Sequence, residues 1–478
     1  MKMKLLCSAM AAASLLLSAC GGSDDSTSTT PPLPETKVPT KNVLFFLGDG
    51  MGITTMTAAR IYSVGEDGEL TMDKLPETAF VHTFSNDAQV TDSAPSMAAY
   101  MTGVKMNNEV ISMTADTTSV DANGNSYQSN YDSTCPSTNG KAVPTLLEQM
   151  KAAGYGTGVI STARITHATP AATYSHVCHR DAENTIAAAL VPGGAGYNAS
   201  LGDGVDVILG GGSRHFTPKE DGGKRNDKRN LITELKTQKY SYASNATEFA
   251  KLPVDGTKIA ALFTKDHMAY DLDRKPADEP SLAEMTGKAI DALTAKKKGF
   301  FLMVEGGRID HALHATNAKR ALQDTVAFDD AIKTALEKME KVDPGLKNTL
   351  VVVTADHDHT LHLNGYNKIT GKTTPTNPGI LGLVKNYVNG ATETDVNGKT
   401  FTVMGFGNGP SRVATRENVD ETMAAGNDYL QEAIVPLSSE THGGGDVFLG
   451  AQGAGAENFS GVMDNTKVFE LIKKSIGL

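Results

Sequence analysis

The sequence has no excess of basic residues, no tryptophan and only four cysteines. Its 44 Lys and Arg residues stand against 55 Asp and Glu residues, which gives a net charge of −11. Nonspecific binding to nucleic acid depends on neutralising phosphates, so this composition argues against a nucleic-acid partner. The same charge would disfavour an anionic substrate, but a few bound divalent cations would reverse the sign locally. Whole-chain charge therefore leaves the substrate class open.

The apolar run at the N-terminus is too short to span a bilayer as a stable helix. It covers Leu5–Leu17, behind the charged Lys2 and Lys4, as in a signal peptide. The stretch Leu17-Ser18-Ala19-Cys20 that follows resembles the lipobox of bacterial lipoproteins. We predict that residues 1–19 are a lipoprotein signal peptide and that Cys20 is the lipidated first residue of the mature chain. The alternative is an ordinary secretory signal cleaved near Ala19.

A lipidated Cys20 would anchor the exported protein stably to the bacterial envelope. Gly21 supplies no acidic inner-membrane retention signal, so we expect the outer membrane, on either its periplasmic or its surface side. Residues 20–40 are rich in Ser, Thr and Pro and nearly free of apolar side chains. They are predicted to be a tether between the lipid and the folded domain.

Two cysteines remain once Cys7 is removed with the signal peptide and Cys20 carries lipid. In an exported chain, the remaining Cys135 and Cys178 suggest one disulfide. Cys178 also stands next to His179, so a metal-binding role is the alternative.

Strand-like and helix-like segments alternate from Lys41 onward. Val43–Leu47 is a continuous apolar run, as expected of a strand buried on both faces. The alternation predicts an α/β fold with a doubly wound, mostly parallel central sheet and helices on both of its faces. Further strands are expected at Gly158–Ser161, Val205–Leu209, Phe300–Val304 and Leu350–Thr354, and helices at Pro144–Ala153, with Pro144 in the first position, Ala182–Ala189, Ser281–Ala295, Ala315–Lys338 and Thr466–Ile476.

Residues 360–440 interrupt this alternation with clusters of Gly, Thr, Asn and Pro and with short β-like runs such as Thr400–Val403. We expect an inserted cap or crown-like subdomain there, over the mouth of the site, within one folded domain of residues 41–478.

Polar side chains follow the predicted strands. Asp49 follows the first strand, Thr162–Thr169 the second, Glu305 the Phe300 strand and Asp356 the Leu350 strand. Ligand sites of open α/β sheets lie beyond the carboxyl ends of the strands. We therefore expect these side chains to share one pocket.

Three clusters combine carboxylates with imidazoles, the usual ligands of zinc. Asp310 and His314 are spaced i, i+4 at a predicted helix start, so both face the same way. Asp356 and His357 end a predicted strand and can reach one metal if the backbone turns there, whereas Asp358 and His359 are assigned to a supporting role or to none.

The third cluster is Thr441-His442-Gly443-Gly444-Gly445-Asp446, in which His442 precedes three glycines. Such an HGGG sequence also forms the oxyanion loop of lipases, but the G-x-S-x-G motif that this reading requires is absent, so a metal-ligand role is preferred. Ser93 stands at a predicted strand-to-helix junction and is interpreted as a metal-activated nucleophile. Arg180 is interpreted as a bidentate clamp for phosphate oxygens, because the Asn and the Gly-rich loop of a kinase are missing around His179-Arg180-Asp181.

Together these motifs resemble the alkaline phosphatase family, from about Lys41 to the C-terminus. The resemblance is carried by Gly48-Asp49-Gly50, Asp92-Ser93-Ala94, Glu305-Gly306-Gly307-Arg308-Ile309-Asp310-His311, Thr354-Ala355-Asp356-His357 and Thr441-His442-Gly443-Gly444, in the family's order.

The resemblance implies a phosphate monoester hydrolase that acts through a phosphoserine intermediate on Ser93, by in-line displacement. It implies that Arg180 holds two phosphate oxygens and that the protein is a homodimer. It further implies two Zn²⁺ ions and one Mg²⁺ ion: a first Zn²⁺ on Asp310, His314 and His442, a second on Asp49, Asp356 and His357, and the Mg²⁺ on Asp49, Thr169 and Glu305.

Two positions depart from the best-studied bacterial pattern, which has Asp and Lys where His167 and His311 stand. Histidine at both positions is similar to the animal enzymes, and it leaves open how the third metal is held. The main alternative activity is that of a phosphodiesterase or sulfatase of the same superfamily, although Met97 replaces the arginine of the sulfatase motif. A non-catalytic metal- or phosphate-binding lipoprotein would not need Ser93.

Overall fold

The computed structural model describes residues 41–296 and 298–478. The predicted signal peptide, the lipidated Cys20 and the tether of residues 20–40 lie outside the described residues. Among the described residues, no helix combines the length and the hydrophobicity that crossing a bilayer requires.

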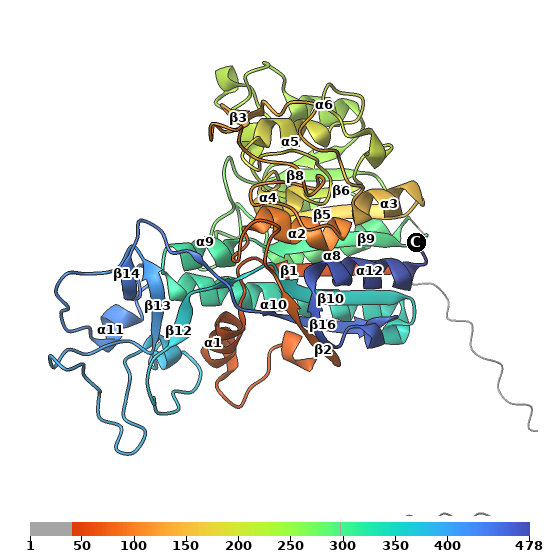
Figure 1. Cartoon of the computed structure of the whole chain (residues 1–478). Coiled ribbons are helices and arrows are strands. Elements are labelled where there is room, and N and C mark those ends of the chain that lie inside the picture. The colour runs from red at the N-terminus through yellow and green to blue at the C-terminus, as the bar shows by residue number, and fades with distance from the viewer. Residues whose placement is uncertain (1–40, 297) are drawn as a thin grey trace, which may run out of the picture. The chain divides into compact units, whose positions relative to one another are not determined.

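A ten-stranded sheet forms the centre of the domain (Figure 1). Seven neighbouring strands at one side of it run parallel to one another, and the strand that borders them is antiparallel to both of its neighbours. The prediction of a mostly parallel α/β sheet is therefore confirmed. In spatial order the strands are β17 (Gly461–Asp464), β2 (Glu77–His82), the antiparallel β16 (Val447–Gly453), and then the parallel β10 (Thr349–Ala355), β1 (Asn42–Gly48), β9 (Phe300–Gly306), β5 (Gly156–Arg164), β6 (Val207–Gly211), β8 (Ile259–Leu262) and β7 (Ser241–Ala243).

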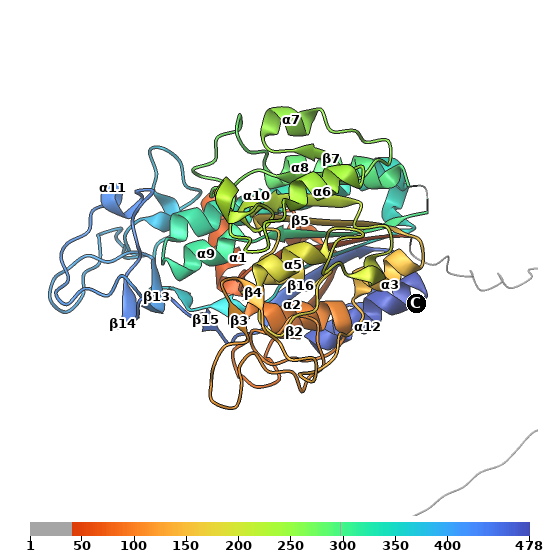
Figure 2. The ribbon, with the colours of Figure 1, turned by 90° about the horizontal axis from the view of Figure 1, so that it is seen from above.

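Helices cover both faces of this sheet (Figure 2). The helices α8 and α10 lie on one face, and α2, α3 and α12 lie on the other. The helices are α1 (Ile53–Val64), α2 (Ser93–Thr102), α3 (Leu146–Ala152), α4 (Ala168–Ala171), α5 (Glu183–Ala189), α6 (Leu231–Thr237), α7 (Ala246–Ala250), α8 (Leu282–Thr294), α9 (Arg308–His314), α10 (Ala318–Val342), α11 (Glu421–Ala424) and α12 (Asn465–Ile476).

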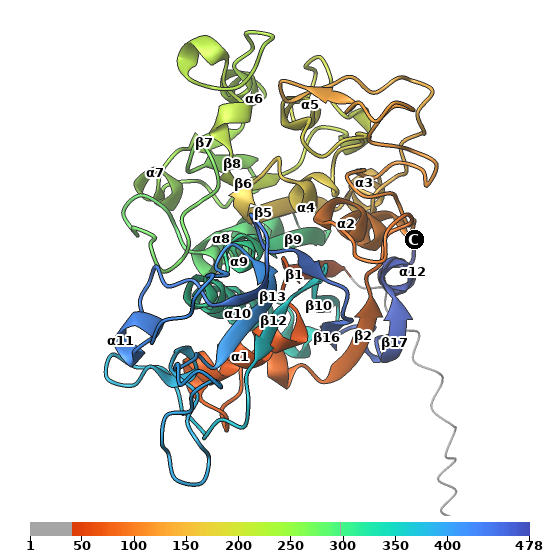
Figure 3. The same cartoon turned by 60° about the vertical axis from the view of Figure 1, so that its left-hand side comes forward.

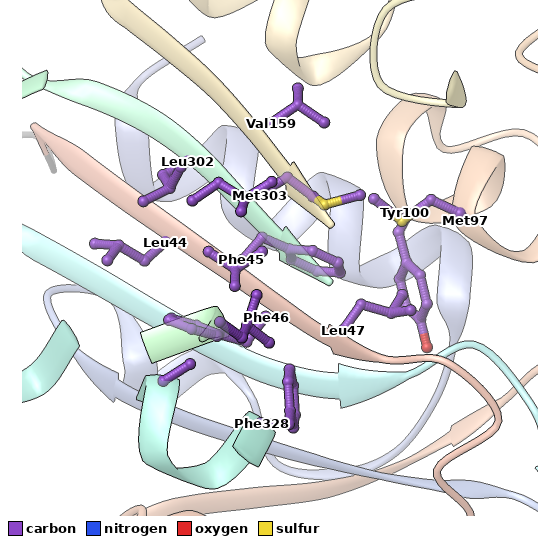
Figure 4. Packing of buried hydrophobic residues seen from close by; sticks show 14 of the residues in the cluster. Leu44, Phe45, Phe46, Leu47, Met97, Tyr100, Val159, Leu302, Met303 and Phe328 are labelled. Carbon is purple, nitrogen blue, oxygen red and sulfur yellow. The ribbon is translucent and has the colours of Figure 1, made fainter. Parts of the chain in front are cut away.

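The central strand β1 shows why its sequence is apolar without alternation. Every residue of β1 is buried, because consecutive side chains point to opposite covered faces. The ring of Phe45 packs against Tyr100 of α2, with centroids 5.4 Å apart, and the ring of Phe46 packs against Phe328 of α10, with centroids 6.1 Å apart (Figure 4). One strand thus joins the two helical layers.

Three local predictions around the main sheet are wrong. The helix predicted from Ala315 starts at Ala318, because Asn317 caps it by accepting from the Arg320 N–H. Pro144 is not in the first position of its helix, since Thr145 is the cap that precedes Leu146. No strand leads directly into Ser93, since β2 ends at His82 and irregular backbone follows.

A separate three-stranded sheet lies within the range 360–440. It consists of β12 (Leu361–Leu363), β13 (Met404–Gly409) and β14 (Ala433–Pro436) (Figure 1), and β12 and β13 are seen side by side in Figure 3. The strand expected at Thr400–Val403 is displaced to β13, and Thr400 and Thr402 form only isolated bridges. Two residues on either side of this segment, in β11 (Asp358–His359) and β15 (His442–Gly443), pair with each other. That pairing brings the late His442 back to the end of β10.

Candidate active site

Parallel register brings the first group of acidic residues together. Gly48 of β1 lies between Ala355 of β10 and Gly306 of β9, so the residues that end these strands meet at one edge of the sheet. The ligand atoms of Asp49, Asp356 and His357 all lie within 4.8 Å of one another. The Nε2 atom of His357 is 3.5 Å from Asp49 Oδ1 and 3.3 Å from Asp356 Oδ2.

The second group forms around Asp310 on the short helix α9. The Asp310 Oδ1 atom is 3.2 Å from His314 Nε2 and 3.5 Å from His442 Nε2. These two imidazole nitrogens are themselves only 3.1 Å apart. The carboxylate and both rings therefore point at one small volume, as three ligands of a single metal would.

His359, which the sequence reasoning assigned to a supporting role or to none, joins this second group. Its Nε2 atom is 2.8 Å from Asp310 Oδ1, and its Nδ1 atom is 2.5 Å from Glu440 Oε2. Glu440 is buried and also accepts from the Thr360 N–H and hydroxyl. Sequence reasoning missed Glu440, although it lies two residues before His442.

The third group consists of Asp49, Glu305 and His167. Thr169, at the start of α4, is buried, and its hydroxyl has no hydrogen-bond partner among the described residues. The same holds for both carboxylate oxygens of Asp49, for Glu305 Oε1 and for Asp356 Oδ2. Buried oxygens are rarely left without a partner, so this set fits divalent cations.

The electrostatics of the carboxylates support this fit. Burial, reinforced by Asp356 and other neighbouring carboxylates, raises the pKa of Asp49 well above its usual value. Burial is also the main reason that the pKa of Glu305 is raised to about 8. Asp310 is different: burial would raise its pKa, but the charge of His314 and hydrogen bonds from three histidines hold it well below the usual value. Like charges buried side by side need a compensating positive charge.

Ser93 is the first residue of α2 and lies beside the first group. Its Oγ atom is 3.2 Å from His357 Nε2, and the side chain is buried. The preceding Asp92 caps the helix by accepting from the Ala94 N–H at 2.7 Å. Ser96, one turn along, donates to the Asp356 carbonyl at 2.6 Å and ties the helix to the end of β10.

Arg180 is held near Ser93 because it contacts Asp92, the residue that precedes the serine. Its Nη1 atom donates to Asp92 Oδ1 at 3.0 Å, and its Nη2 atom is 3.2 Å from His167 Nε2. Its backbone N–H donates to the Glu109 carbonyl at 2.8 Å. The carboxylates of Asp92 and Glu109 outweigh burial and raise the pKa of Arg180, so the guanidinium is a permanent cation.

A disulfide joins Cys135 to Cys178, two residues before Arg180. The Cα atoms are 6.1 Å apart, which is ordinary for a disulfide. The structure thus selects the disulfide over the metal-binding role that the sequence left as an alternative for Cys178.

Comparison with known proteins agrees with this geometry. Residues 40–478 match the alkaline phosphatase family. The chain is 36% identical over 460 residues to the alkaline phosphatase of Gadus morhua, covering 90% of each chain. It is also 36% identical over 461 residues to the tissue-nonspecific alkaline phosphatase of Homo sapiens, covering 90% of this chain and 82% of the human one.

Solved structures show the same fold. A cold-active alkaline phosphatase from a Shewanella species superimposes with a TM-score of 0.63 at 25% identity, covering 91% of this chain and 99% of that one. The Thermus thermophilus alkaline phosphatase superimposes with a TM-score of 0.66 at 23% identity and covers 92% of each chain. The sequence relatives and the shared fold agree over nearly the whole described domain, and the chain therefore belongs to the alkaline phosphatase family, whose members hydrolyse phosphate monoesters.

Proposed function

We propose that this chain hydrolyses phosphate monoesters through a phosphoserine intermediate on Ser93, at a centre of two Zn²⁺ ions and one Mg²⁺ ion. The observation that carries the proposal is the position of Ser93 Oγ, 3.2 Å from His357 Nε2, in a site whose buried carboxylate oxygens lack hydrogen-bond partners among residues 41–296 and 298–478. A serine hydroxyl is a weak nucleophile at its free pKa, and coordination to a metal is a recognised way to activate it.

The residues present fit the ions that the family implies. Nitrogen and oxygen donors suit zinc, and oxygen donors suit magnesium. Bound ions of this kind would stabilise negative charge on the attacking and leaving oxygens. Asp310, His314 and His442 would hold the first Zn²⁺, Asp49, Asp356 and His357 the second, and Asp49, Thr169 and Glu305 the Mg²⁺.

The chain's own side chains then account for the remaining steps. Ser93 Oγ gives its proton to solvent water and attacks phosphorus, the bond from phosphorus to the ester oxygen breaks, and the leaving alkoxide takes a proton from water to become the alcohol. Water then hydrolyses the phosphoserine, which frees Ser93 and inorganic phosphate. Arg180 supplies two N–H donors to the non-bridging oxygens, and Asp92 fixes the orientation of its guanidinium fork.

Replacement of Ser93 by Ala tests the nucleophile. The variant should lose the phosphoenzyme that wild type forms with labelled phosphate and that can be trapped at low pH, while it keeps the wild-type content of zinc and magnesium. A labelled band that persists in Ser93→Ala would show that another residue accepts the phosphoryl group.

We also propose that the enzyme is exported, anchored through lipid on Cys20 and assembled as a homodimer. The lipobox-like stretch at residues 17–20 supports the anchor, and family membership supports the dimer. Cys20→Ala should move the activity from the membrane fraction to the soluble fraction, and light scattering of the detergent-free variant should give twice the chain mass. Activity that stays with the membrane, or a monomeric mass, would contradict the respective proposal.

A further inference from the structure

Three histidines form a cluster beside the proposed metal groups. His167 precedes α4, His311 lies on α9, and His267 comes from the loop after β8. Their ring nitrogens lie within 4.8 Å of one another, and the rings of His267 and His311 are 4.1 Å apart. The side chain of His267 is 17% exposed, so the cluster is reachable from solvent. Sequence reasoning did not single out His267.

Each imidazole of the cluster faces an arginine. Arg180 Nη2 lies 3.2 Å from His167 Nε2, Arg308 Nη1 lies 2.9 Å from His311 Nδ1, and Arg164 Nη1 contacts His267 Nε2. A guanidinium can only donate, so each imidazole accepts there and carries its proton on the other nitrogen.

The cluster consequently holds more donors than acceptors. His167 Nδ1 is buried and has no partner among the described residues. His267 Nδ1 faces a second donor, the backbone N–H of Arg164, at 3.2 Å, although a neutral imidazole can accept only once. Arg308 Nε is also buried without an acceptor in the described part of the chain. An anion with several oxygens would satisfy these donors.

Positively charged arginine side chains accompany this excess of donors. Arg308 forms no ion pair with any described residue, and its Cζ atom lies over the Tyr270 ring, 3.8 Å from the centroid. Arg164 is paired with Glu183 and Asp266. Of the acids near the cluster, Asp310 is turned to His314, His359 and His442. Asp266 Oδ1 lies 3.8 Å from His267 Nε2, and this carboxylate is shared between Arg164 and Arg214. Asp324, near Arg308, is buried, and burial raises its pKa.

The contacts of the cluster oppose a bound cation. Three imidazoles can form a zinc tripod, but an arginine already faces one ring nitrogen of each histidine, and a divalent ion would have to displace these arginines.

We propose that His167, His267 and His311, with Arg164 and Arg308, form a subsite for a second anionic group of the substrate. This subsite adjoins the phosphate clamp, because His167 contacts Arg180, and it adjoins the first proposed zinc group through the chain neighbours His311 and Asp310. The substrates that it favours are phosphoanhydrides and compact bisphosphorylated esters, and His267 is a specificity-determining residue. The inference rests on the proposed phosphomonoesterase function and adds a preference to it.

The test compares two substrates on three variants. For wild type, His267→Phe and His267→Ala, kcat/KM is measured with pyrophosphate and with p-nitrophenyl phosphate, and the ratio of the two values is the readout. Both replacements remove the ring nitrogens of His267, and His267→Phe keeps most of the volume. We expect the ratio to fall at least about 10-fold in both, as the loss of one charge-assisted hydrogen bond predicts. His82→Phe, a half-exposed histidine on β2, is the matched control and should leave the ratio unchanged.

Three results would overturn the subsite. A ratio within twofold of wild type would remove any role in selectivity, and an equal loss for both substrates would make His267 a general support of the phosphate clamp. One zinc equivalent present in wild type and absent from both His267 variants would show a cation site.

A binding measurement keeps this inference separate from the proposed function. Imidodiphosphate and inorganic phosphate are titrated calorimetrically into metal-loaded wild type and His267→Phe, which requires no turnover. Preference for imidodiphosphate in wild type, lost in the variant, supports the subsite even if p-nitrophenyl phosphate is not hydrolysed. Equal affinities in wild type would refute the subsite whatever the enzyme's activity.

Discussion

Removal of the Cys135–Cys178 disulfide should lower stability far more than activity. The perturbation is the double variant Cys135→Ser/Cys178→Ser, which leaves no unpaired thiol at either position. The bridge spans 43 positions of the chain, and these include α3, the strand β5 and the whole of α4. A cross-link across such a segment restricts the unfolded chain strongly.

The size of the effect follows from the loop length. Loop-closure entropy for about 43 residues corresponds to about 4 kcal/mol at 25 °C. The described domain runs from Lys41 to Leu478, and an unfolding entropy of about 2.1 cal/mol/K per residue over that length converts the loss into a fall in Tm of about 4 °C.

Activity should change little because other contacts hold the Arg180 segment. Val177 and Ile111 exchange two backbone hydrogen bonds of 2.9 and 3.0 Å, and the Arg180 N–H donates to the Glu109 carbonyl. These bonds do not depend on the sulfur atoms. Each preserved backbone bond contributes about 1 kcal/mol to holding this segment in place. We therefore expect kcat/KM for p-nitrophenyl phosphate at 25 °C to stay within about threefold of wild type.

The assay is scanning calorimetry of the metal-loaded proteins, together with steady-state kinetics at 25 °C. A phosphine reductant should lower the Tm of wild type to that of the double variant and should not affect the variant. A Tm within 1 °C of wild type would refute the loop-entropy reasoning. A large fall in kcat/KM with an unchanged Tm would instead show that the bridge positions Arg180.

Three further perturbations have defined outcomes. Arg180→Ala should lower kcat/KM at least about 100-fold, from the loss of charge-assisted bonds to phosphate, with unchanged zinc content by mass spectrometry; loss of zinc would make Arg180 a structural residue. Chelation should abolish activity, and Zn²⁺ with Mg²⁺ should restore it; unchanged turnover after verified metal removal would contradict metal catalysis. His176→Gln removes the bond from His176 Nε2 to Glu148 Oε1 at 2.8 Å. Burial lowers the pKa of His176, but the hydrogen bond and charge of Glu148 outweigh it and raise the pKa above 6.5. The stabilisation, about 1.5–3 kcal/mol, is therefore complete below about pH 6.5 and is lost as the pH rises through the folded pKa. Urea unfolding at pH 6 and pH 9 should give a larger difference between wild type and His176→Gln at pH 6, and an equal difference at both would show that this bond does not depend on charge.

The strands that could be predicted from sequence are those buried on both faces. The runs in β1, β9 and β10 are apolar throughout, and the structure buries each of them completely. The strand β2 could not be found in this way, because Glu77–His82 alternates buried and exposed residues beside β16. Its partners come from the end of the chain, so only tertiary pairing reveals it.

The site residues likewise divide into those that follow predictable strands and those that lie in irregular segments. Asp49, Glu305 and Asp356 could be grouped in advance, because parallel strands bring their carboxyl ends to one edge. His267 and Glu440 lie in irregular segments whose sequence carries no period or motif. Only the tertiary fold brings the loop after β8, which carries His267, and the segment before β15, which carries Glu440, to the site.

The buried oxygens of this site need a positively charged neighbour, and the buried nitrogens close to them need a negatively charged one. Within the described part of the chain, Asp49, Glu305 and Asp356 leave acceptors without donors, whereas His167 and Arg308 leave donors without acceptors. A cation alone would satisfy the first set, and an anion alone would satisfy the second. A phosphate ester that bridges bound metals and the arginine side would satisfy both at once, which explains why an acidic chain can take an anionic substrate.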